Sequence, residues 1–185
     1  MDAQKQDFAA DKKIKKEKIG GKIYLMASPS GEHINVQDNL NTIFNVYFKQ
    51  NKRRCRAMND APLYVDENNF YEPDVKVLCR ETRSDDIPVI AVEVLSKSTR
   101  DRDTGIKLKE YAKLKIKEYW IIDLKYHAID IYLLGESQTY EKRDTYTYYP
   151  PGERDEEENE AATEFSPVSF PELIVKLEDV FDIFE

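Results

Sequence analysis

Apolar residues cluster in short, nearly continuous runs through the middle of the chain. Residues 75–79 and 88–95 are rich in Val, Ile and Leu and are bounded by Pro, Ser and Asp, which is typical of strands in a sheet that is covered on both faces. Residues 118–124 predict a third buried strand, and residues 128–134 alternate as its hairpin partner. A tyrosine-rich alternation over residues 138–149 predicts a half-exposed antiparallel strand.

Two segments have the 3.6-residue period of an amphipathic helix. Residues 28–31 can cap a helix over residues 32–50, whose apolar stripe should pack on one face of the sheet. A second helix is predicted over residues 104–117, after a polar loop. Its apolar arc contains Lys107, which is therefore aimed at the sheet, and Lys115, which we expect to extend to water two turns later. Strands that alternate with helices place the chain in the α/β class.

Shorter elements are predicted outside this central region. A Gly-Gly pair at residues 20–21 indicates the turn of a hairpin. Residues 52–58 predict a strand with several basic side chains. Near the end of the chain, residues 173–176 predict a short strand, and residues 177–181 predict a terminal turn of helix. These elements are additional antiparallel strands beside the central sheet.

The two ends of the chain differ in polarity. Residues 1–16 are polar and predict a tail or a short helix, whereas residues 17–185 predict a single domain. Phe181, Ile183 and Phe184 are apolar residues in the last segment, where a solvated tail would be polar. We expect them to dock either onto the body of the domain or across a dimer interface.

Composition narrows the class of protein. A chain of 185 residues with 41% hydrophobic residues is sufficient for one sizeable core. It has no run of 18 apolar residues that would predict a membrane span, and charges stand where a signal peptide needs an apolar core. We therefore expect a cytoplasmic protein without a membrane segment. Cys55 and Cys79 do not form a CxxC pair, and we expect two buried thiols, neither a zinc site nor a disulfide.

The net charge of −8 argues against a general nucleic-acid coat protein. Charge is unevenly distributed, however. Residues 97–117 contain eight Lys or Arg and three acids, and residues 153–160 contain six acids and one Arg. The basic stretch could contact phosphates, although a charged helix face is more often solvated surface.

Two carboxylates on apolar strands are the main chemical signal. Glu93 lies within the run VIAVEVL, and Asp74 directly precedes the strand over residues 75–79. A buried carboxylate is costly unless a cation or hydrogen-bond donors meet it. Lys107 lies in the first turn of the next helix and is directed at the sheet, so we expect Asp74, Glu93 and Lys107 to converge around a divalent metal.

Two further residues are secondary candidates for the site. Glu32 and His33 lie at the start of the helix predicted over residues 32–50, where anions and metal-bound groups are often found. Each is more often a capping or surface residue than a metal ligand, because histidine serves structural hydrogen bonds as readily as metal ligation.

The ordered motifs resemble a known family. A PD dipeptide precedes a strand that carries EVLS, a D-x-x-x-K-x-x-x-Y helix follows, and EYWIID comes next. This order is similar to that of the restriction-endonuclease-like, or PD-(D/E)xK, superfamily, and specifically to its Uma-two family. The likeness extends to EKIGGKIYLMASPSGEH near the start and to FPELIVKLEDVF near the end. It implies a mixed central sheet flanked by helices.

The resemblance also implies a mechanism. Asp74, Glu93 and the main-chain carbonyl of Val94 would hold Mg²⁺, for which Mn²⁺ would substitute, and Lys107 would act on the attacking water or the phosphate. The superfamily lysine lies two residues after the acid, where this chain has Leu95; the Uma-two family is similar in placing it on the next helix. The implied function is an endonuclease with DNA as substrate and a homodimer as assembly, since one such site cuts one strand.

Two alternatives belong to other functional classes. The same fold could serve as a non-cleaving nucleic-acid-binding or protein-binding module, which the acidic net charge and Leu95 favour. A purely structural assembly factor would bind no metal at all.

Overall fold

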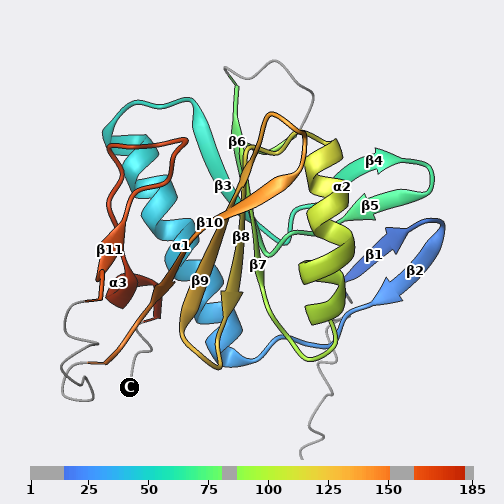
Figure 1. Cartoon of the computed structure of the whole chain (residues 1–185), viewed down its shortest axis with the longest axis horizontal. Coiled ribbons are helices and arrows are strands. Elements are labelled where there is room, and N and C mark those ends of the chain that lie inside the picture. The colour runs from blue at the N-terminus through green and yellow to red at the C-terminus, as the bar shows by residue number, and fades with distance from the viewer. Residues whose placement is uncertain (1–14, 81–86, 151–160, 182–185) are drawn as a thin grey trace, which may run out of the picture.

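A mixed sheet forms the centre of the computed structural model, which describes residues 15–80, 87–150 and 161–181. Within these ranges the central sheet has six strands, and Figure 1 shows their arrangement. The pairing of β7 with β8 is parallel, and the other pairings are antiparallel. In order across the sheet, the strands are β10 (Tyr140–Thr147), β9 (Ala128–Leu134), β8 (Glu118–Asp123), β7 (Ile90–Val94), β6 (Val75–Cys79) and β3 (Cys55–Asn59).

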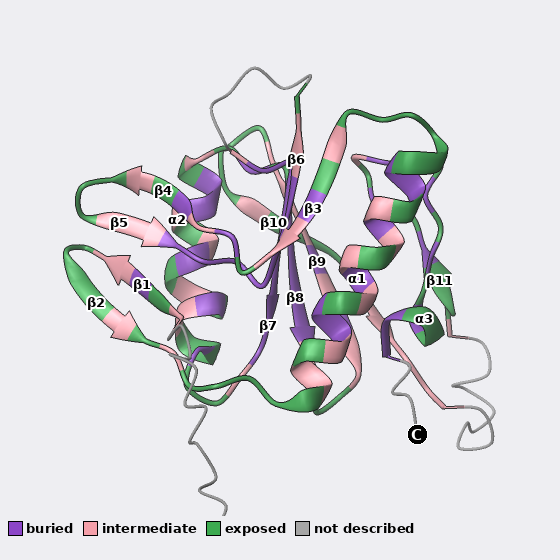
Figure 2. Cartoon of the chain, turned by 180° about the vertical axis from the view of Figure 1, so that it is seen from behind, coloured by how far each residue is buried: buried purple, intermediate pink, exposed green. Residues whose placement is uncertain are grey.

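The interior strands face two separate hydrophobic clusters, one on each side of the sheet. This agrees with the prediction of a sheet that is covered on both faces. Helix α1 (Gly31–Gln50) covers one face, together with the C-terminal elements β11 (Glu164–Phe165), β12 (Val175–Lys176) and α3 (Leu177–Phe181). On β8, Trp120 and Ile122 belong to the cluster under α1, whereas Tyr119 and Ile121 belong to the opposite cluster. Figure 2 shows β7 and β8 buried between these layers. Such two-sided burial explains their continuous apolar sequences.

A second sheet lies beside the opposite face. It contains β1 (Lys16–Ile19), β2 (Lys22–Leu25), β5 (Asn69–Tyr71) and β4 (Leu63–Asp66), in the order β2-β1-β5-β4. Gly20 and Gly21 have φ of 58° and 82° in the tight turn between β1 and β2, a conformation that favours glycine. The hairpin predicted at residues 20–21 is therefore confirmed.

The helix between β7 and β8 differs from the prediction at both ends. It begins with a π-helical turn, η1 (Arg102–Ile106), and continues as α2 (Lys107–Lys113). The expected end at Lys117 was four residues too late. Lys115 has a φ of 61°, and the N–H of Ile116 donates to the carbonyl of Tyr111 at 3.1 Å, as at helix ends that close through a left-handed residue.

The cysteine prediction was wrong. Cys55 and Cys79 form a disulfide between β3 and β6, with their Cα atoms 4.0 Å apart. The two residues are directly opposite in the antiparallel register, although 24 positions separate them in sequence. Sequence spacing alone does not reveal a cross-strand pair, because the register that brings the two cysteines together is set by tertiary pairing.

We expect reduction of this disulfide to lower the free energy of unfolding by about 3 kcal/mol, because it closes a loop of this length in the unfolded chain. A Cys55→Ser, Cys79→Ser double variant should have the same deficit. Urea unfolding of the wild type with and without dithiothreitol measures the difference. The double variant is the control, since its stability should not respond to reductant.

The C-terminal prediction is confirmed for the part of the segment that the structure describes. Phe181 is buried and packs against His127 and Tyr148, with ring centroids 5.5 and 5.9 Å away. Docking is therefore onto the body of the domain. Ile183 and Phe184 lie outside the described residues. No helix in the described ranges is long and apolar enough to cross a membrane.

Candidate active site

Two carboxylates meet at the edge of the central sheet where β6 begins and β7 approaches its end. Val75 is paired with Val92, so the antiparallel register places Asp74, one residue before β6, opposite Glu93. Opposite residues on antiparallel strands project from the same face. Both acids line a cavity of about 590 Å³. The predicted convergence of Asp74 and Glu93 is therefore present.

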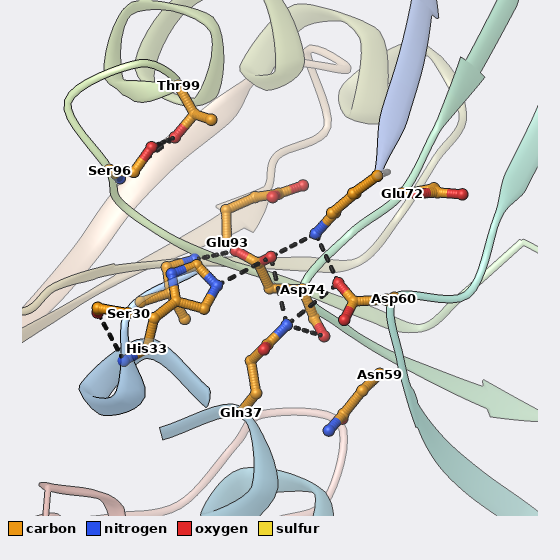
Figure 3. A network of polar contacts seen from close by, with 12 residues as sticks. Ser30, His33, Gln37, Asn59, Asp60, Glu72, Asp74, Glu93, Ser96 and Thr99 are labelled. Carbon is orange, nitrogen blue, oxygen red and sulfur yellow. Dashed lines mark hydrogen bonds and ion pairs between the residues drawn. The ribbon is translucent and has the colours of Figure 1, made fainter. Parts of the chain in front are cut away.

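Asp74 is held by contacts from several elements (Figure 3). Its Oδ2 accepts a hydrogen bond from the main-chain N–H of Val94 at 2.7 Å. Its Oδ1 lies 2.5 Å from the ammonium of Lys15 and 3.2 Å from Nε2 of His33. Gln37 on α1 donates to the main-chain carbonyl of Asp74 at 3.0 Å. The carboxylate thus has a fixed orientation, and a cation already touches one of its oxygens.

These contacts determine the ionisation of Asp74. Burial by itself would raise the pKa of Asp74, but the hydrogen bond from His33 and the charge of Lys15 outweigh it and hold the pKa well below its usual range. For Lys15, burial acts to lower the pKa, and the surrounding carboxylates of Asp74, Glu93 and Asp60 raise it further than burial lowers it. Asp74 and Lys15 are therefore an ion pair across the neutral pH range.

Glu93 belongs to a second, fully buried cluster. The ammonium of Lys107 lies 2.7 Å from Oε1 of Glu17, 2.9 Å from Oε1 of Glu93 and 3.0 Å from Oδ1 of Asp103. The hydroxyl of Tyr111 donates to the same Oε1 of Glu93 at 2.8 Å. Lys107 is completely buried, and the helix does direct it at the sheet as predicted.

The cluster contains more negative than positive charge. Burial raises the pKa of Glu93, and the carboxylates of Asp103, Asp74 and Glu17 raise it further, against the opposing effect of Lys107. Burial opposes the charge of Lys107, but its three carboxylates raise the pKa of its ammonium well above the usual value. Lys107 therefore stays charged, and its charge offsets only part of the rise in the pKa of Glu93.

The structure separates the predicted residues into those that reach the cavity and those that do not. His33 and Val94 line it, as does Leu95, which stands where the superfamily has its lysine. Lys107 is not among the lining residues; it lies behind Glu93. Glu32 is also absent from the lining, and its carboxylate lies 3.5 Å from Nε2 of His127.

Several residues of the site were missed by the sequence analysis. Glu17 and Asp103 both contact Lys107. Asp103 had a signal, because it precedes Lys107 by four positions and such pairs share a helix face. Glu17 shares its strand face with Ile19 by alternation, which indicates an inward direction. Lys15 and Asp60, which are joined at 2.7 Å, had no comparable signal.

A divalent cation fits the donor set of the cavity. Mg²⁺ prefers oxygen ligands and is commonly bound by one or two carboxylates, with water and substrate phosphate as the remaining ligands. Asp74 and Glu93 provide such a pair, and the ammonium of Lys15 on Asp74 shows that a positive charge is accommodated there. Within residues 15–80, 87–150 and 161–181, no three His, Cys, Asp or Glu side chains form a complete ligand cage.

The fold and these motifs define a restriction-endonuclease-like protein. The sequence profile of the Uma2 family, described as "Putative restriction endonuclease", matches residues 3–170. The chain therefore belongs to the Uma2 family, as the sequence motifs indicated. The matched range contains the three residues of the predicted site, Asp74, Glu93 and Lys107.

Two individual proteins are similar to this chain. A crystal structure of a "putative nuclease belonging to DUF820" from Anabaena variabilis superposes with a TM-score of 0.68 at 20% identity and covers 90% of this chain and 89% of the other. It supports the fold. An uncharacterised protein of Synechocystis is 29% identical over 124 residues, which are 64% of this chain. The match spans 65% of the length of the Synechocystis protein.

Proposed function

We propose that this protein is a metal-dependent endonuclease that hydrolyses DNA phosphodiester bonds in the cavity lined by Asp74 and Glu93. One observation carries the proposal: two carboxylates from adjacent strands line one cavity, and a buried lysine supports one of them. Membership of the Uma2 family and the nuclease-like fold support the same class of reaction.

Each residue has a distinct part in this proposal. Asp74 and Glu93, with the carbonyl of Val94, would hold Mg²⁺ or Mn²⁺, which when bound supplies polarisation of the phosphate and a lowered pKa for water. Val94 also orients Asp74 through its N–H. We expected Lys107 to act on the attacking water or the phosphate. Because its ammonium lies on Glu93 behind the cavity, we propose that it positions Glu93 and opposes the rise in the pKa of this carboxyl. The homodimer implied by the sequence resemblance remains part of the proposal.

Purified protein with Mg²⁺ or Mn²⁺ is expected to nick or cut supercoiled plasmid DNA. Asp74→Asn and Glu93→Gln should each reduce the rate by about a thousandfold, because each removes a charged metal ligand. Agarose gels, which separate the supercoiled, nicked and linear forms of the plasmid, measure the rate. Glu178→Gln is the matched control, since Glu178 is exposed on α3 and does not line the cavity. Cleavage that persists unchanged in both site variants would rule out the mechanism.

Leu95 favours an alternative function, in which the protein binds nucleic acid without cutting it. It lines the cavity at the position where the superfamily has a lysine, so the described cavity could bind a metal and nucleic acid without cutting. Fluorescence anisotropy with labelled DNA and RNA, with and without Mn²⁺, distinguishes the two functions. Metal-dependent binding without strand scission on any substrate would assign the binding function.

A further inference from the structure

The cavity contains a lysine that the motifs do not include. Lys15 precedes β1, and its side chain reaches the cavity wall, where it contacts Asp74 at 2.5 Å and Asp60 at 2.7 Å. Its side chain is 19% exposed. Its ammonium thus lies between the two aspartates, which Figure 3 labels. Lys15 therefore occupies the side of Asp74 that faces the cavity.

The two oxygens of Asp74 have different contacts. Oδ2 accepts a hydrogen bond from the N–H of Val94, which is part of the main chain and cannot move without moving β7. Oδ1 carries the ammonium of Lys15, with His33 and Gln37 at 3.2 and 3.3 Å. A divalent metal on this carboxylate would stand within a few ångströms of the ammonium, and two like charges at that separation repel each other strongly in a poorly solvated site.

We propose that Lys15 is a tethered cation that fills the metal position of Asp74 in the metal-free protein and exchanges with the metal. The inference rests on the proposed function only in taking Asp74 as a metal ligand. When a metal binds, the ammonium leaves Oδ1 and keeps its ion pair with Asp60, which is half exposed at the cavity wall. Lys15 would then remain in the wall of the cavity through Asp60.

In the metal-free protein, Lys15 balances part of the negative charge of the two buried carboxylates. Asp74 and Glu93 are both buried, and the charge of Asp74 raises the cost of ionising Glu93. The ammonium of Lys107 offsets the negative charge of Glu93 within the buried cluster. The ammonium of Lys15 offsets the negative charge of Asp74 on the cavity side. Exchange of Lys15 for a metal therefore keeps a positive charge on Asp74 at every stage.

Removal of Lys15 is expected to tighten metal binding. Isothermal titration of the full chain with Mn²⁺ should give a dissociation constant about tenfold lower for Lys15→Met than for the wild type, which corresponds to one hydrogen bond to a charged group. Lys16→Met is the matched control: Lys16 is the next residue, is exposed, and does not line the cavity. An affinity that is unchanged or weaker in Lys15→Met would overturn the exchange.

A second measurement uses the wild-type protein and does not depend on the folding of a variant. Lysine labelling with an amine-reactive reagent, read by peptide mass spectrometry, should show slow modification of Lys15 without metal. Mg²⁺ should accelerate labelling of Lys15 several-fold, because the ammonium leaves Asp74, and should leave Lys16 unchanged. Equal protection of Lys15 with and without Mg²⁺ would contradict the proposal.

These outcomes separate the exchange from the nuclease function. Mn²⁺ binding that Asp74→Asn abolishes but Lys15→Met does not alter would refute the exchange and leave the nuclease proposal intact. Tighter Mn²⁺ binding by Lys15→Met without DNA cleavage by the wild type would support the exchange and refute the nuclease. Absence of Mn²⁺ binding in every variant would refute both.

Discussion

Lys107→Met is expected to lower the free energy of unfolding at pH 8 by about 3–5 kcal/mol, the usual cost of leaving a buried ion pair without one partner. The substitution preserves much of the side-chain volume but leaves three carboxylates, those of Glu17, Glu93 and Asp103, with no cation in a fully buried cluster. Urea unfolding followed by circular dichroism measures the loss. Lys113→Met on the same helix is the control, because the Lys113 side chain is 71% exposed.

The cost of Lys107→Met should depend on pH in a defined direction. The pKa values of Glu93 and Asp103 are raised in the folded protein, so their protonation favours folding at low pH, and this contribution is lost as pH rises through those values. The pKa of Lys107 is raised, so its charge is constant between pH 5 and 8. The deficit of the variant should therefore be smaller at pH 5 than at pH 8. Equal deficits at both pH values would show that charge is not the cause.

Trp120→Ala is expected to cost about 3–5 kcal/mol as well, through a cavity in the core. Trp120 is completely buried on β8, and its ring lies 5.6 Å from Phe44 of α1 and 5.2 Å from Phe165 of β11. It therefore joins the central sheet to both α1 and β11, which cover the same face. Thermal unfolding by calorimetry measures the loss, and Tyr126→Ala, at a side chain that is 60% exposed, should change the stability by less than about 0.5 kcal/mol.

A conservative variant separates the two roles of Trp120. Its Nε1–H donates to Oε2 of the buried Glu118 at 3.2 Å. Trp120→Phe keeps most of the packing but removes this donor, and should cost about 1–3 kcal/mol. A Trp120→Phe variant as unstable as Trp120→Ala would show that the hydrogen bond, and not the packing, dominates. Because α1 carries His33 and Gln37 to Asp74, the same packing also supports the site.

The apolar strands and α1 were predictable, because their signals are local. β7 and β8 are continuous apolar runs, and α1 begins one residue from its predicted start, since the hydroxyl of Ser30 accepts from the N–H of His33 at the helix cap. Lys107 was placed correctly by helical phase alone. Its position behind Glu93 was not predictable, because that depends on how Glu17 from β1 fills the same buried space.

The remaining parts of the site depend on tertiary register. Lys15 was included in the predicted polar tail over residues 1–16, yet its side chain reaches the cavity and β1 begins at Lys16. The boundary between residues 16 and 17 itself remains a prediction, because residues 1–14 lie outside the described ranges. The disulfide was missed for the same reason as Lys15: each partner is brought into place by pairing between distant segments.

The disulfide stands at one end of the β3–β6 ladder, and Asp60 and Asp74 flank the other end. Five residue pairs run from Cys55–Cys79 to Asn59–Val75, and the N–H of Asp60 donates to the carbonyl of Asp74 at 3.3 Å. A slip of one position between the strands would turn one aspartate away from the other. The disulfide excludes that slip covalently, so a bond at the other end of the ladder fixes the register that holds Asp60 and Asp74 on either side of Lys15.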